Sequence, residues 1–105
     1  MDDLIITNHA ADRFRERVKL PKRAVTKNAR LALEKGISQA EATGQLRKYI
    51  DNLYRNEAQQ ANNIRIYCGM VYIFYFDTLL TLFPVPKPLQ KQAVLLQRQK
   101  RDSFG

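Results

Sequence analysis

This chain is poor in several residue types, and each shortage excludes a class of protein. Its 105 residues include a single cysteine, Cys68, so the sequence offers no internal disulfide and no cysteine spacing typical of a zinc site. We therefore expect no metal and no cofactor, and a reducing, cytoplasmic setting. Cys68 is followed by Gly69 at an expected turn, with no charged helix start beside it, which favours a structural or incidental thiol over a reactive one.

Secretion signals and long hydrophobic runs are also missing. The start, Met1 to Asn8, has no basic region and too short an apolar run for a signal peptide. The longest apolar segment, Met70 to Phe83, is interrupted by Asp77 and Thr78 and is too short to span a bilayer. The sequence therefore predicts a cytoplasmic protein with no membrane partner.

Acidic residues are scarce. The chain has 10 of them against 18 Lys and Arg, which gives a net charge of +8. Between Arg13 and Lys35 nine basic residues face two glutamates, so this segment carries +7 of that charge. Such a balance predicts RNA or another nucleic acid, or an acidic protein, as the partner, although a basic domain without such a partner is the alternative. The expected phosphate contacts are Arg15, Lys19, Lys22, Arg23, Lys27 and Arg30.

Sequence-specific reading of DNA is not supported, because the basic segment carries no helix-turn-helix, zinc-finger or RNP signature. The charge instead predicts binding to the phosphate backbone, with a strong dependence on salt.

The only histidine, His9, opens a stretch that reads as an amphipathic helix from His9 to Val18. On such a helix one face, about 100° wide, gathers its ionisable residues, and an adjacent face is apolar. The ionisable face holds His9, Arg13, Glu16 and Arg17, and the apolar face holds Ala10, Ala11, Phe14 and Val18.

This face contains the groups that metal-independent RNA cleavage requires: a base, an acid and cations that stabilise a charged phosphorane. His9 is the candidate acid or base, since an imidazole titrates near neutral pH. Arg13 and Arg17 are candidates to hold the scissile phosphate, because guanidinium groups match phosphate oxygens. Glu16 is a candidate to orient His9 or to act as the second acid–base group.

Each of these residues also has a structural interpretation. His9 can cap or pack at the start of the helix, where a cation is unfavourable. Glu16 lies three residues after Arg13, the spacing of a surface ion pair worth a few tenths of a kcal/mol. Arg13 and Arg17 repel each other on a bare helix, so an anion between them would explain the arrangement.

The first half of the chain predicts a short strand and then helices. Leu4 to Thr7 reads as the strand, and Asn8 is the expected cap of the helix that ends near Lys19–Leu20. Pro21 opens a second helix with Gly36 as its C′ residue. Ser38 and Glu41 form a capping-box pattern for a third helix, whose apolar stripe is Leu46, Tyr49, Ile50, Leu53 and Tyr54.

The second half predicts a three-stranded antiparallel meander. Its strands are Ile64–Tyr67, Val71–Phe76 and Leu79–Phe83, its turns are Cys68-Gly69 and Asp77-Thr78, and the middle strand is apolar on both faces. The polar segment Glu57–Asn63 precedes it, and Pro84, Pro86 and Pro88 stop it. We expect a single α+β domain over residues 1–88, then a basic C-terminal helix or tail over 89–105 with Leu89–Lys100 helical.

Helices should cover one face of the sheet, and the other face should be partly open or covered by the C-terminal segment. Tyr67, Tyr72 and Tyr75 on the hairpin are candidates to stack on bases, and Thr81 is a candidate hydroxyl from the third strand. Alternating aromatics also commonly fill the core of a sheet. We expect Tyr49 and Tyr54 in the core, and one or two of the hairpin tyrosines exposed.

The arrangement resembles the small bacterial and phage domains grouped as DUF4258, which are placed near the RelE-like and barnase/EndoU/colicin-type ribonuclease toxins. The matching residues are His9, Ala10, Arg13, Glu16 and Arg17 near the start, then Tyr72, Phe74, Thr81 and the Pro84-Val-Pro86 exit. The resemblance covers most of residues 4 to 86. The segment Ile37–Asn63, which reads as an inserted helix, and the basic tail after Pro88 depart from it.

The resemblance implies an RNA-binding protein that acts as a metal-independent, toxin-like endoribonuclease with a His/Arg site, and whose basic face an acidic antitoxin would cover. The alternative is a non-catalytic phage or mobile-element protein that uses the same patch to bind nucleic acid or to inhibit a host or defence nucleic-acid enzyme. A third interpretation is an interaction module whose basic tail contacts an acidic protein.

Overall fold

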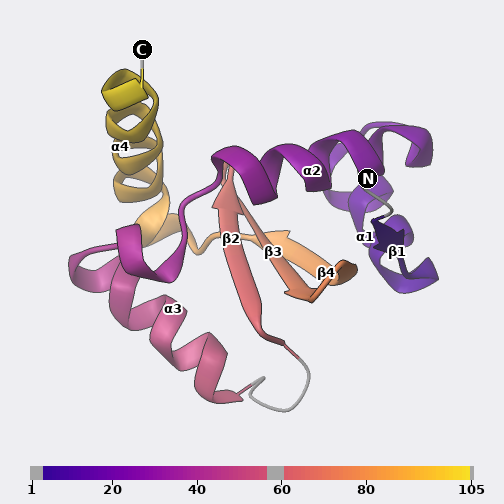
Figure 1. Cartoon of the computed structure of the whole chain (residues 1–105), viewed down its shortest axis with the longest axis horizontal. Helices are drawn as coiled ribbons and strands as arrows, with labels where there is room; N and C mark the ends of the chain where they lie inside the picture. The colour runs from indigo at the N-terminus through magenta and orange to yellow at the C-terminus, as the bar shows by residue number, and fades with distance from the viewer. Residues whose placement is uncertain (1–3, 57–60, 105) are drawn as a thin grey trace.

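Four helices and a mixed four-stranded sheet make up the parts of the chain that the structure, a computed structural model, describes: residues 4–56 and 61–104. The predicted α+β class is confirmed. The strands are β1 (Ile5–Ile6), β2 (Asn63–Tyr67), β3 (Met70–Tyr75) and β4 (Thr78–Pro84). The helices are α1 (Asn8–Val18), α2 (Val25–Lys35), α3 (Gly44–Asn56) and α4 (Lys87–Phe104), with short 3₁₀ helices η1 (Lys22–Ala24) and η2 (Gln39–Glu41) (Figure 1).

The sheet has the order β1-β4-β3-β2. Strands β2, β3 and β4 form the predicted antiparallel meander, and β1 adds to its edge parallel to β4. The backbone N–H of Ile5 donates to the carbonyl of Asp77 across 2.8 Å, and that of Thr7 donates to Leu79 across 3.3 Å. This parallel pairing, which the local pattern did not predict, places the start of α1 beside β4.

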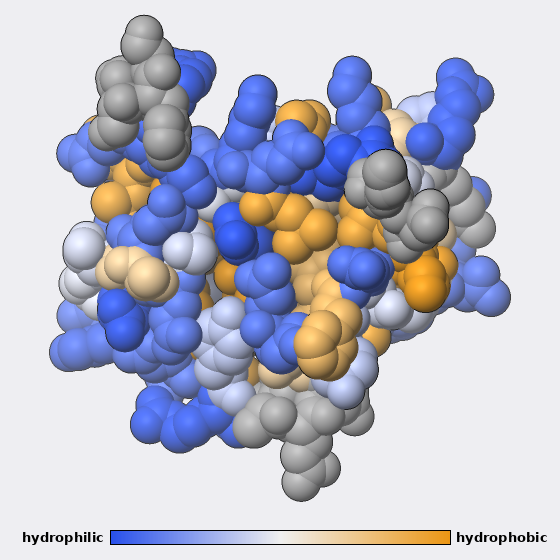
Figure 2. Space-filling view, in the orientation of Figure 1, coloured by the Kyte–Doolittle hydropathy of each residue, from blue (hydrophilic) through white to orange (hydrophobic). Residues whose placement is uncertain are grey.

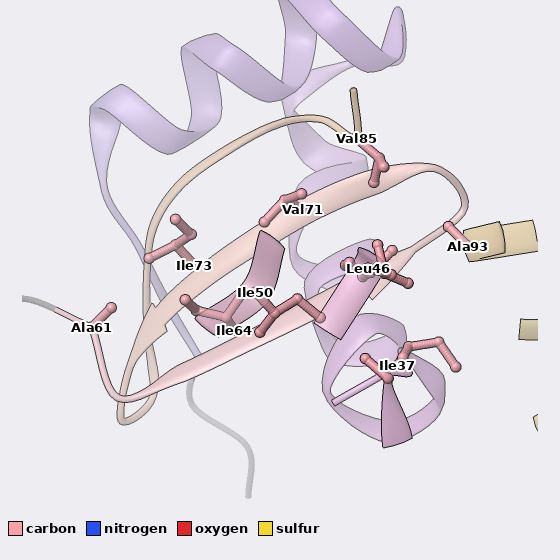
Figure 3. Packing of buried hydrophobic residues seen from close by; sticks show 11 residues of the cluster. Ile37, Leu46, Ile50, Ala61, Ile64, Val71, Ile73, Val85 and Ala93 are labelled. Atoms are coloured by element: carbon pink, nitrogen blue, oxygen red, sulfur yellow. The ribbon is translucent and has the colours of Figure 1, made fainter. Parts of the chain in front are cut away.

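The middle strand β3 is buried on both faces, as its apolar sequence predicts. Tyr72 and Phe74 point to a cluster formed with α1 and α2, and Val71 and Ile73 point to a second cluster. Figure 3 shows the second cluster, in which Ile50 of α3 and Ala93 of α4 meet the sheet. The C-terminal segment covers this second face, as one of the two expected arrangements has it, and α3 covers it together with α4.

Three local signals act at positions different from those predicted. Thr7 caps α1 in place of Asn8, because its hydroxyl accepts a hydrogen bond from the backbone N–H of Ala10. The capping box of Ser38 and Glu41 forms, but it caps the N-terminus of η2, and α3 begins only at Gly44. The second hairpin turn lies at Phe76–Asp77, one residue earlier than predicted.

Gly36 follows the last residue of α2, but its conformation is extended and not left-handed, with φ −69° and ψ 162°. A Cβ atom there would lie 2.4 Å from the carbonyl oxygen of Ala32 and 3.1 Å from that of Ile66. Glycine is needed because two backbones approach closely: the neighbouring Ile37 pairs with Ile66 of β2. The segment Glu57–Gln60, part of the predicted polar exit, lies outside the described residues.

Within the described ranges, no helix combines the length and the apolar character that crossing a membrane requires.

Candidate functional site

The N-terminus of α1 is fixed against β4 by Thr7. The Thr7 hydroxyl accepts a hydrogen bond from the Ala10 backbone N–H at 3.0 Å and donates to the carbonyl of Leu80 at 3.1 Å. Leu80 is the extra residue of a β-bulge: Ile73 of β3 pairs with Thr81, and Phe74 pairs with Leu79. Bulges often redirect a strand near functional groups. Here Thr7 links the bulge to α1 and so sets the position of His9.

His9 contacts β4 directly. Its Nε2 atom lies 3.1 Å from the hydroxyl oxygen of Thr81, 72 residues away in the sequence, and the imidazole is exposed. Which of the two groups donates depends on the tautomer of His9. The structure therefore brings together two residues that the sequence singled out separately.

Arg13 and Glu16 form an ion pair, with Nη1 of Arg13 3.1 Å from Oε1 of Glu16. Their side chains are 40% and 53% exposed, so this is the surface pair that the i,i+3 spacing indicated. Glu16 thus pairs with Arg13, whereas His9 contacts Thr81.

The exposed side of α1 continues to Arg17, which lies at the surface. At a rise of about 1.5 Å per residue, Arg13 lies about 6 Å and Arg17 about 12 Å along the helix axis from His9. One side of α1 thus presents an imidazole followed by two guanidinium groups at one-turn intervals. We call His9, Thr81, Arg13, Glu16 and Arg17 the α1 site.

The remaining basic residues of the segment extend from the α1 site along α1, η1 and α2. Both α1 and α2 pack on the same face of the sheet, through Phe14 and Ala29 among others. In Figure 2 hydrophilic side chains project along the edge of the molecule where α2 lies. The cations of this surface, the basic layer, are the exposed Arg15, Lys19, Arg23 and Lys27 and the half-buried Arg30. Lys22 lies in η1, and its side chain is outside the described atoms.

The assignment of Tyr72 as a nucleic-acid contact is wrong in this structure. Tyr72 is 2% exposed and stacks on Phe74, with ring centroids 6.5 Å apart and planes 15° apart. Burial, reinforced by the nearby Cys68 and Tyr67, raises the pKa of its phenol to about 12. The ring packs between the sheet and the helices, which is the core role that alternating aromatics commonly have.

Tyr75 is the exposed hairpin tyrosine, at 48%, and its neighbour Phe76, which the sequence pattern did not single out, is 66% exposed. The two rings meet edge to face with centroids 4.7 Å apart. No local signal identified Phe76, because the sequence pattern placed it at the end of the strand and the turn one residue later. Tyr49 and Tyr54 pack against the core as expected, although both stay partly exposed.

Among the described residues, no group of three or more histidine, cysteine, aspartate or glutamate side chains is arranged to hold a metal ion. Cys68 is exposed in the β2–β3 turn.

Comparisons with protein-family models, with curated proteins and with solved structures gave no match to this chain.

Proposed function

We propose that this protein binds RNA through the basic layer and cleaves it, without a metal ion, at the α1 site. The observation that supports this most directly is the contact between His9 and Thr81, which places a titratable imidazole at one end of an array of cations. The DUF4258-like sequence pattern adds support, because its matching residues His9, Arg13 and Thr81 belong to the same site.

The RNA-binding part of the proposal depends on charge and geometry. Nine Lys and Arg against two Glu lie between Arg13 and Lys35, on helices that cover one face of the sheet. Such a surface attracts a phosphate backbone through counterion release, irrespective of base sequence. Tyr75 and Phe76 supply exposed rings on which unpaired bases stack. These rings flank the start of β4, and Thr81 lies three residues, about 10 Å, along that strand from Thr78.

The proposed cleavage is an internal transesterification of RNA. His9 takes the proton of a 2′-hydroxyl, whose oxygen attacks the adjacent phosphorus. The bond from phosphorus to the 5′-oxygen breaks, and that oxygen takes a proton from solvent. The products are a 2′,3′-cyclic phosphate and a 5′-hydroxyl end.

Arg13 would stabilise the charge on the phosphorane, and Arg17 would hold a neighbouring phosphate. The Arg13–Glu16 pair is exposed and weak, so a phosphate can displace the carboxylate.

The binding test is fluorescence anisotropy of a labelled single-stranded RNA at increasing salt. The double variant Arg15→Glu and Lys27→Glu reverses two exposed charges of the basic layer, and Lys48→Glu with Lys91→Glu reverses two exposed charges on α3 and α4. We expect the first variant to lose at least about tenfold in affinity and to show a shallower salt dependence. Equal affinity in the two double variants would contradict binding by the basic layer.

The cleavage test is incubation of the wild type with RNA in EDTA, with His9→Ala and Arg13→Ala as variants and circular dichroism as the control for folding. Products that carry a cyclic phosphate and disappear with either variant would support the α1 site. No cleavage by the wild type, together with salt-dependent binding, would favour the second candidate function, a non-catalytic binder of nucleic acid. The pairing of Arg13 with Glu16, which partly neutralises this guanidinium, is the observation that favours that candidate.

A further inference from the structure

A cavity of about 650 Å³ lies between the end of α2, the β2–β3 turn and the second half of α4. Figure 1 shows the end of α2 beside the tip of β2, with α4 at the upper left. The volume lies within the range of small-molecule sites. Neither the α1 site nor Tyr75 and Phe76 are among the described residues that line it, so it is separate from the proposed cleavage site.

The lining of this cavity is positively charged at its rim and partly apolar inside. Four cations, Lys35, Arg98, Lys100 and Arg101, line it against one acid, Glu34. Lys100 is held in place, because its ammonium donates to the Gly36 carbonyl at 2.7 Å and to Glu41 at 3.0 Å. Lys35, Arg98 and Arg101 are exposed at the surface. Such a rim attracts an anion that carries more than one negative charge.

The walls offer contacts for a flat, partly apolar group. Tyr67 is half-buried and Ala93 is buried, and both line the cavity. The side-chain oxygen Oε1 of Gln97 is buried without a hydrogen-bond partner in the structure, while Nε2 of the same amide donates to the Lys35 carbonyl at 2.6 Å. Buried acceptors are rarely left unpaired, so this atom indicates a missing N–H donor.

We propose that this cavity binds a nucleoside phosphate, with the phosphate on Arg98, Arg101 and Lys35 and the base between Tyr67 and α4. Guanidinium pairs match phosphate oxygens, and the half-buried Tyr67 with the buried Ala93 of α4 offers an apolar surface to a base. The same chemistry is presented by a free nucleotide and by the 5′-phosphorylated end of an RNA strand. The proposal does not depend on cleavage at the α1 site.

The test is isothermal titration of the full chain with ADP, adenosine and pyrophosphate, and with a short RNA carrying either a 5′-phosphate or a 5′-hydroxyl. We expect saturable binding of ADP that is at least about tenfold tighter than that of adenosine or pyrophosphate, since both the base and the phosphate contribute. Because the basic layer binds both RNAs alike, tighter binding of the RNA with a 5′-phosphate than of the RNA with a 5′-hydroxyl would identify an RNA end as the ligand. Absence of saturable ADP binding together with equal affinity for the two RNAs, or equal affinity for pyrophosphate and ADP, would overturn the proposal.

Two variants with the same charge change locate the site. Arg98→Glu should weaken ADP binding by at least about tenfold, whereas Lys48→Glu on α3, which is exposed and does not line the cavity, should change it by less than about twofold. Equal effects of the two variants would contradict binding in this cavity.

Cys68 provides a second readout that does not depend on RNA. It is the only cysteine of the chain, it is exposed, and it lines the cavity. We expect saturating ADP to slow the alkylation of Cys68 by a maleimide in the wild type and not in Arg98→Glu. If ADP leaves the rate of the wild type unchanged, the ligand does not occupy this cavity.

Discussion

The ammonium of Lys100 donates a hydrogen bond to the carboxylate of Glu41 at 3.0 Å, although 59 positions separate the two residues. The same ammonium donates to the Gly36 carbonyl at 2.7 Å. One side chain thus joins the second half of α4 to the segment between α2 and α3. This contact holds α4 beside the end of α2 and fixes one wall of the cavity.

Replacing Lys100 by methionine should destabilise the fold. Its side chain is 15% exposed, and the variant removes one hydrogen bond from each of its two partners. Among the described residues, Glu41 then keeps only its hydrogen bonds from Ser38, and the Gly36 carbonyl keeps only a long one from Arg65 at 3.4 Å. We expect the free energy of unfolding to fall by about 1–2 kcal/mol in urea titrations. Lys48→Met, at an exposed position of α3, is the matched control and should change it by less than about 0.5 kcal/mol. Equal stabilities would show that the Lys100 contacts contribute nothing.

Stability should fall in acid partly through Glu41. Partial burial by itself would raise the pKa of this carboxyl, but hydrogen bonds from Ser38 and Lys100 outweigh it, and the pKa lies below its ordinary value of 4.5. A lowered pKa in the folded state gives stability that is present above 4.5 and is lost as the pH falls through the lowered value.

The Glu41→Gln variant should therefore be less stable than the wild type at pH 7, by less than about 1 kcal/mol because the carboxylate is 40% exposed. The difference should shrink as the pH falls below 4.5, as followed by urea denaturation at several pH values. A difference that is constant with pH would exclude the charge of Glu41 as its cause.

Phe76 destabilises the fold through its backbone conformation and exposes an aromatic ring. Its φ of 51° is left-handed, a region that phenylalanine rarely adopts and asparagine tolerates. We expect Phe76→Asn to raise the free energy of unfolding by about 0.5–1 kcal/mol and to lower RNA affinity by about tenfold, through the loss of base stacking.

Cys68→Asn is the control for this variant, because Cys68 also has a φ of 51° in the other hairpin turn. It should gain similar stability and leave the affinity for an RNA with a 5′-hydroxyl unchanged. If RNA affinity survives Phe76→Asn, the ring does not contact the nucleic acid.

Thr81→Val tests the contact with His9 without removing the imidazole. Valine keeps the shape of threonine but has no hydroxyl, so Nε2 of His9 loses its partner at 3.1 Å. We expect cleavage in EDTA to slow by about tenfold or more, while RNA affinity changes by less than about twofold, since the charge of the basic layer is intact. Thr78→Val, on the same strand, is the control and should leave both unchanged. A parallel loss in the two variants would indicate a general effect on β4.

Gly36→Ala should be among the more damaging single-atom additions in the chain. The new Cβ would lie 2.4 Å from the Ala32 carbonyl oxygen, a backbone atom that cannot move freely within α2. We expect a loss of about 1–3 kcal/mol in thermal or urea unfolding. Gly44→Ala is the comparison. Gly44 has a left-handed φ of +58°, but the nearest atom to its new Cβ belongs to the flexible side chain of Gln92, so this variant introduces left-handed strain without a backbone clash. A loss at Gly44 larger than that at Gly36 would show that the close approach is not limiting.

Much of the fold follows from local patterns in the sequence. The helical spacing of apolar residues in α1 and α2, the apolar run of β3 and the prolines after Phe83 specify helices and strands, because each pattern depends on neighbours within a few residues. The helix cap lies at a residue other than the predicted one because two neighbouring residues can both supply it. Thr7 and Asn8 can both cap α1, and the bond from Thr7 to Leu80, which decides between them, joins distant parts of the chain.

The fold class, the charge of the segment from Arg13 to Lys35 and the exposed face of α1 could be inferred from the order of the residues alone. Three features could not: the contact of His9 with Thr81, the burial of Tyr72 beside an exposed Phe76, and the cavity that Arg98 shares with Lys35. The physical reason is that periodicity shows which face of an element is apolar, whereas contacts across the sheet depend on strand order, a bulge and the packing of α4.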